Sequence, residues 1–198
     1  QVAILNDVVV TASVDTSFTF TVAGLPIGVT VNGTTTDVDT SGSAQTIPFG
    51  TLSANANVAG QRLNVTTNAS NGFTVTVQAD QTLTSSNNDT IDVFDDGDGA
   101  AAPKAWEQPT GTFGSVNTYG HWGLTSDDDI NGSEFGSALF VGNFSTSSRA
   151  VFHHSGPANG STDNIGSTTG AYAAAVTAFQ EAGDDYTATL TYVATPVF

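Results

Sequence analysis

The chain has 198 residues, and three Lys and Arg against nineteen Asp and Glu give it a formal net charge of −16. Nucleic acids and anionic membranes are bound through Lys and Arg, so a chain of this charge repels nucleic acids and is disfavoured at anionic membrane surfaces. No run of about 18 apolar residues is present, so we expect no membrane span. There is no Cys, which excludes disulfides and thiol chemistry.

Composition and the first residue indicate an exported protein. The chain lacks Met and begins with Gln1, as expected after removal of a signal peptide. Thr, Ser, Gly, Asn and Ala dominate, whereas Lys and Glu are scarce. This composition is typical of β-rich surface proteins, so we expect an extracellular or cell-surface location.

The first predicted element, VAILNDVVVTASVDTSFTFTV, covers residues 2–22. Nine of its eleven even-numbered residues are apolar, and this alternation indicates a strand with one buried face. Fully extended, 21 residues span roughly 70 Å, whereas strands usually run about 17–20 Å. Turn-forming residues at 15–17 therefore predict a division into a leading strand over 1–14 and a domain strand over 17–22.

The leading strand is a candidate donor for another molecule. It carries few charges, and it lacks the Lys and Pro that protect exposed strands from edge pairing. An extended segment of this kind can complete the sheet of a neighbouring copy, and head-to-tail exchange builds an open fibre. The side chains expected in that contact are Val2, Ile4, Val8, Val10, Ala12 and Val14.

The remaining residues, 15–198, are expected to form a β-sandwich domain. Strands are predicted within 24–33 and 45–52, and 61–80 is interpreted as a hairpin turning at Asn71-Gly72. A loop-rich insertion over about 81–137 holds two short strands, 90–94 and 119–125. Regular strands return at 137–143, 149–154 and 171–179, and the chain closes on a strand within 185–198. The Ala content of 171–179 is also compatible with a short helix, although the flanking Gly170 and Gly183 favour a strand. The predicted fold is all-β, a single antiparallel sandwich of jelly-roll or immunoglobulin-like type with long loop insertions.

Two acidic loops leave two interpretations open. Ca²⁺ binds six to eight oxygen ligands, which Asp-rich loops punctuated by Gly can supply. Solvated turns, in which Asp accepts bonds from local amides, have the same composition. No cofactor is required under the second interpretation. The candidate calcium ligands are Asp92, Asp95, Asp96 and Asp98 in one loop, and Asp127, Asp128, Asp129 and Glu134 in the other.

Catalysis is not expected from this sequence. No Gly-x-Ser-x-Gly motif and no zinc-type His spacing is present, and adjacent His153 and His154 on a strand would face opposite ways. Trp106 and Trp122 could stack on sugars, although core packing is the ordinary role of Trp122. Seven Asn-x-Ser/Thr triplets are candidate glycosylation sites, at Asn32, Asn64, Asn68, Asn88, Asn131, Asn143 and Asn159.

Two stretches resemble known surface proteins. AGDDYTATLTYVATP (182–196) resembles the closing strand of exported bacterial β-sandwiches, including WxL cell-wall-binding domains, and HWGLT (121–125) matches one of their two Trp-x-Leu motifs. The second motif is replaced by Tyr192-Val193-Ala194. The overall plan is similar to secreted surface proteins of uncultivated bacteria. It is also similar to pilins of the spore-coat-U type and biofilm fibre subunits, which lend an N-terminal strand to a neighbour.

Two functions follow as expectations. The first is a structural subunit of an extracellular filament that is a head-to-tail polymer of this chain. The second is a surface module that binds a cell-wall polymer or a glycan. They differ in whether the leading strand belongs to another copy or to the chain's own sheet.

Overall fold

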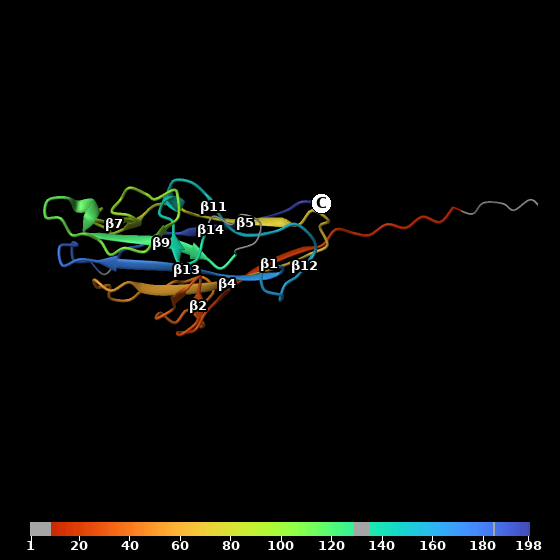
Figure 1. Cartoon of the computed structure of the whole chain (residues 1–198), viewed down its shortest axis with the longest axis horizontal. Helices are drawn as coiled ribbons and strands as arrows, with labels where there is room; N and C mark the ends of the chain where they lie inside the picture. Colours follow the sequence, from red (N-terminus) through yellow and green to blue (C-terminus); the bar gives the residue numbers. More distant parts are fainter. Residues whose placement is uncertain (1–8, 129–134, 184) are drawn as a thin grey trace, which may run out of the picture.

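The computed structural model describes residues 9–128, 135–183 and 185–198, and these form an all-β, sandwich-like fold (Figure 1). The large sheet has the order β1-β4-β13-β9-β7-β6, with β12 added beside β4, and the small sheet has the order β11-β5-β14. The large sheet consists of β1 (Phe18–Gly24), β4 (Asn57–Thr67), β6 (Leu83–Thr84), β7 (Thr90–Val93), β9 (Gly120–Ser126), β12 (Ala158–Asn159) and β13 (Ser167–Val176). The small sheet consists of β5 (Phe73–Ala79), β11 (Arg149–His154) and β14 (Leu190–Pro196).

Short elements decorate these sheets. Two ribbons pair β2 (Thr30–Val31) with β3 (Thr34–Thr35) and β8 (Lys104–Ala105) with β10 (Leu139–Phe140). The first turns at Asn32-Gly33, where both residues have positive φ. Two 3-10 turns are present, η1 (Val116–Thr118) and η2 (Asn143–Ser145). Neither has the length or apolar character that crossing a bilayer requires, and the described residues contain no other helix.

The main core lies between the two sheets. Alternating residues of β4 and β5, such as Leu63, Val65, Val75 and Val77, are buried there from opposite sides. A second core covers the outer face of the large sheet, where Ala171 and other small residues of β13 allow loops to approach closely. β13 is buried on both faces, as expected of an interior strand, although its first three residues, Ser167, Thr168 and Thr169, are polar. A strand in place of a helix is thus confirmed over 171–176, although β13 begins four residues earlier than expected and the strand does not continue to 179.

The predicted hairpin over 61–80 is wrong, although both of its strands exist. β4 and β5 belong to different sheets, and their apolar faces meet across the core instead of lying side by side. Gly72 sits in the connection with φ +79°, and a Cβ there would lie 1.7 Å from the His154 carbonyl oxygen. The Asn-Gly turn therefore carries the chain from one sheet to the other beside β11.

Four other expectations need correction. Residues 45–52 form no strand, and the stretch predicted over 24–33 contains only β2. The segment 81–137 is not merely an insertion, since its strand β9 is buried and central in the large sheet. The sandwich is not wholly antiparallel, because β7 pairs with β9 in parallel. Parallel neighbours need a connection of about a dozen residues or more, which the loop over 94–119 provides.

Candidate functional site

The N-terminal segment, residues 9–17, is the most exposed part of the described chain. It forms no strand, and it runs away from the sandwich into open space (Figure 1). The side chains of Val10 and Val14 are 88% and 86% exposed, and Ala12 is exposed as well. These three candidate donor residues therefore have no apolar partner within the described part of the chain. Val2, Ile4 and Val8 lie outside the described residues.

Asn68 fixes the point where this segment leaves the body. Its Oδ1 accepts the Ser17 backbone N–H at 2.8 Å, and its Nδ2 donates to the Asp15 carbonyl at 2.8 Å. The Thr67 hydroxyl donates to the Ser17 carbonyl at 2.9 Å. These bonds hold the backbone at 15–17 beside the end of β4, at what we call the exit end of the sandwich.

The two sheets are open toward each other along one side, which we call the seam. β1 and β14 are terminal strands of their sheets, and the rings of Phe20 and Tyr192 lie 6.2 Å apart across the seam. The side chains that point inward here are only half-buried, unlike the fully buried core of β4 and β5. They are Phe18, Phe20 and Val22 of β1 and Leu190, Tyr192 and Ala194 of β14.

The seam widens into a groove of about 1240 Å³ at the opposite end from the exit. One wall is the loop over 44–52, and the other is the segment over 186–190 with Tyr192. The loop is held at the start of β4, because Asn57 donates to the Phe49 carbonyl at 2.7 Å. β4 runs from the groove toward the exit end, and Gln61, which lines the groove, lies roughly 20 Å along the strand from Thr67 at the exit end.

Apolar side chains line both walls and the floor of the groove. They include Ile47, Phe49 and Leu52 on the loop and Tyr186, Ala188 and Leu190 on the other wall, all partly buried against the main core. Small-molecule pockets usually measure about 300–1,000 Å³. The groove exceeds that range and suits an extended chain with alternating apolar residues.

A buried polar chain crosses the core beneath the seam. The Tyr172 and Tyr192 hydroxyls are 2.7 Å apart, and Tyr192 donates to Gln61 Oε1 at 2.8 Å. Gln61 Nε2 in turn donates to the Ala44 carbonyl at 3.0 Å, at the start of the groove loop. Burial raises the pKa of both tyrosines well above the ordinary value, so the hydroxyls remain donors. These hydrogen bonds connect β14, β13, β4 and the groove loop.

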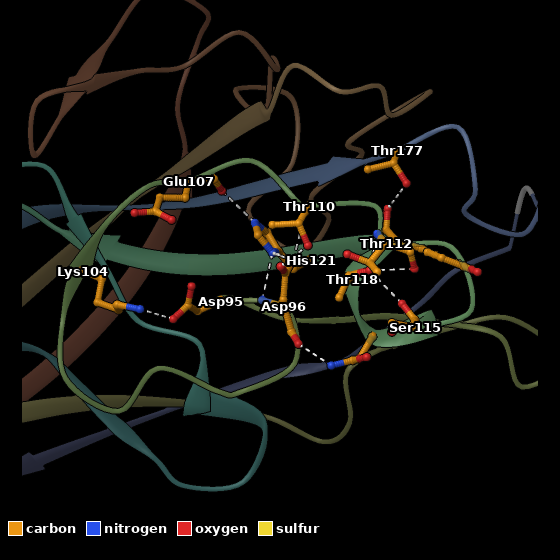
Figure 2. A network of polar contacts seen from close by, with 12 residues as sticks. Asp95, Asp96, Lys104, Glu107, Thr110, Thr112, Ser115, Thr118, His121 and Thr177 are labelled. Atoms are coloured by element: carbon orange, nitrogen blue, oxygen red, sulfur yellow. Dashed lines mark hydrogen bonds and ion pairs between the residues drawn. The ribbon is translucent and has the colours of Figure 1, made fainter.

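In the first acidic loop, the carboxylates of Asp95 and Asp96 already have partners within the protein (Figure 2). Asp95 pairs with Lys104, and the Asp96 carboxylate accepts the Thr110 hydroxyl at 2.7 Å. The Asp96 N–H donates to Nδ1 of His121, whose Nε2 donates to the Glu107 carbonyl at 2.9 Å. Desolvation lowers the pKa of His121 despite the neighbouring carboxylates.

The other candidate ligands have different surroundings. Asp92 is half-buried, and desolvation raises the pKa of its carboxyl group, whereas Asp98 is exposed. Asp127 accepts bonds from the Asn32 N–H and the Thr169 hydroxyl, and Asp128 accepts the His153 N–H at 2.8 Å. Asp129 and Glu134 lie outside the described residues. Within the described ranges, no three His, Asp or Glu side chains form a metal-binding group, and calcium binding stays a prediction.

The glycosylation triplets occupy varied positions. The side chain of Asn32 donates to Thr125 and Gly136, and Asn64 lies inside β4. Asn143 is partly buried, whereas Asn88 and Asn159 are exposed. Asn131 lies outside the described residues.

The two tryptophans belong to the protein's aromatic packing. Trp122 is 2% exposed and packs against Phe144, so its indole is not accessible to a sugar. The Trp106 ring is stacked on Phe94 at 5.0 Å.

No family model, curated protein or solved structure matches this chain.

Proposed function

We propose that this protein is the structural subunit of an extracellular filament, in which the N-terminal segment of each copy completes the sandwich of the next. The observation that carries the proposal is the exposed segment over 9–17, which has no strand partner among the residues that the structure describes. An alternating apolar segment of this kind gains stability only by burial against another surface. Each fully buried valine contributes about 1.5–3 kcal/mol.

The composition of the N-terminal segment supports the same function independently. The segment lacks Lys and Pro, the residues that commonly prevent strand addition. A strand lent in one direction creates a heterologous contact, which propagates as a fibre instead of closing as a dimer. Export to the cell surface belongs to this proposal, and no catalytic residue is assigned.

Electron microscopy of negatively stained protein at neutral pH tests the proposal. We expect fibres from the intact chain and soluble monomers after deletion of residues 1–14. The described residues removed, 9–14, make no contact that holds the sandwich together, so the shortened protein should keep its circular dichroism spectrum. A synthetic peptide of residues 1–14 should then raise its melting temperature.

Matched point variants separate the apolar face from general effects of charge. Val10→Asp places a carboxylate on the apolar face of the donor and should abolish fibres. Ser13→Asp adds the same charge on the other face and should leave assembly largely intact. Fibres from the deleted protein, or an intact chain that stays monomeric, would refute the proposal and favour a wall- or glycan-binding module.

A further inference from the structure

The deeper question is which surface of the neighbour receives the donor segment. This inference rests on the proposed function, since it names the acceptor for that same exchange. We infer that residues 2–14 of a second copy occupy the groove end of the seam and add to the free edge of β14, which extends the small sheet to four strands.

The choice of β14 follows from the two walls of the groove. A donated strand needs a regular edge with backbone groups spaced for a ladder. One wall is the strandless loop over 44–52, whereas the other continues directly into β14, whose edge away from β5 has no partner in the described chain. β1 contributes only Val22 to the groove. The regular edge available at the groove is therefore that of β14.

The placement of the two ends explains why the partner is a second copy. The hydrogen bonds of Asn68 hold the backbone at 15–17 so that the segment before it points away from the sandwich, at the end opposite the groove (Figure 1). Filling its own groove would require the segment to release these bonds and reverse direction. A second copy aligned end to end presents its groove to the outgoing segment without that reversal.

Exposed apolar side chains gather at the same two ends. At the groove end, Phe113 and Phe179 are 83% and 47% exposed, and their rings are in contact at 5.6 Å. At the exit end, Val197 and Phe198 are 48% and 54% exposed, beside the connection that begins at Asn68. End-to-end stacking would cover both patches. Their chemistry matches the contact between two copies better than it matches a polar glycan.

Cysteine cross-linking locates the acceptor, because the natural chain has no Cys to interfere. Thr189 and Thr191 are exposed on the outward face of the β14 segment. Side chains directly opposite on paired strands have Cβ atoms about 4.5–5.5 Å apart, closest at non-hydrogen-bonded pairs, and a disulfide requires about 3.5–4.5 Å. Only a directly opposed pair can therefore form the bond, after a small approach of the two strands. Substitution there leaves the inward-facing apolar contacts untouched.

The experiment mixes single-cysteine proteins in pairs under mild oxidation. Donor variants are Val9→Cys, Thr11→Cys and Ser13→Cys, acceptor variants are Thr189→Cys and Thr191→Cys, and the control is Thr21→Cys on the outward face of β1. We expect at least one donor–acceptor pair to give a covalent dimer on a non-reducing gel, at a yield at least tenfold above that of each variant alone and of the Thr21→Cys mixtures.

The possible outcomes separate an error in the acceptor strand from an error in the proposed function. Normal fibres without a donor–acceptor dimer overturn the placement on β14 and leave the filament intact. Dimers formed with Thr21→Cys instead place the donor on the β1 edge and also overturn the inference. Absence of fibres from the unsubstituted chain refutes the proposed function itself.

Discussion

Asn68 bonds to Ser17 through both its side chain and its backbone. Its Oδ1 accepts the Ser17 N–H at 2.8 Å, and its own N–H donates to the Ser17 carbonyl at 3.3 Å. A single residue directly after β4 thus aligns residues 15–17 with the large sheet. It also sets the direction in which the N-terminal segment leaves.

Asn68→Ala should therefore weaken assembly. The variant loses two side-chain hydrogen bonds near the surface, each worth about 0.5–1.5 kcal/mol, and it frees residues 15–17 to turn back. We expect faster hydrogen exchange at Ser17 and a higher protein concentration for fibre formation. Ser70→Ala removes the same glycosylation triplet but keeps Asn68, so it is the control. Equal behaviour of the two variants would contradict this role.

Tyr192→Phe should destabilise the sandwich more than a surface hydroxyl deletion does. The Tyr192 hydroxyl connects Tyr172 to Gln61, and its loss leaves two buried polar groups without that partner. We expect the free energy of unfolding to fall by about 1–3 kcal/mol in denaturant titrations. Tyr186→Phe is the matched control, since its hydroxyl bonds near the surface to the Glu181 carbonyl. A loss no larger than that of the control would show that the buried chain is not stabilising.

His121 should make the protein less stable in mild acid. Desolvation lowers its pKa in the folded state below the ordinary value of about 6.5, so the unfolded chain binds the proton more tightly. The stabilisation is complete above pH 6.5 and is lost as the pH falls from there toward the folded-state pKa. Thermal melts of wild type and His121→Gln between pH 7.5 and 5 should show a smaller decrease for the variant. Parallel decreases would exclude His121 as the cause.

Calcium should raise the melting temperature if either acidic loop binds it. A ligand that binds only the folded protein, at 100 times its dissociation constant, adds about 2.7 kcal/mol. For a chain of this size that corresponds to roughly 5–10 °C. Melts with calcium, with magnesium and with a chelator test this, and Asp92→Asn with Asp98→Asn should remove a shift caused by the first loop. Identical melting temperatures in all three solutions would show that both loops are ordinary solvated turns.

Phe179→Ser should raise the concentration needed for fibres without unfolding the subunit. Phe179 contacts Phe113 and Tyr119 at the groove end and is half-exposed before assembly. If stacking buries it, its loss costs at least 1.4 kcal/mol, which is a tenfold change in affinity. Ile27→Ser removes an apolar residue that is 61% exposed in the connection between β1 and β2, and it should have little effect. Similar effects of both variants would argue against an end-to-end contact.

Period-two alternation predicted which side chains point into the core. Leu63 and Val65 on β4, Phe73 and Val75 on β5, and Leu190 and Tyr192 on β14 all face inward as the pattern indicates. This succeeds because successive side chains of a strand point to opposite faces, which is a purely local property. The start of β1 at Phe18 follows in the same way from the apolar row that resumes after Asp15, Thr16 and Ser17.

Strand pairing, the groove and the role of Asn68 were decided only by the tertiary structure. Alternation specifies a buried face but not the element that covers it, so β4 and β5 looked like a hairpin although they face each other across the core. The parallel contact of β7 with β9 depends on the long connection between them, which carries no periodic signal. The groove forms where a strandless loop and the edge of β14 fail to close the seam. Such a gap arises from contacts between segments far apart in the chain, and no local pattern encodes it.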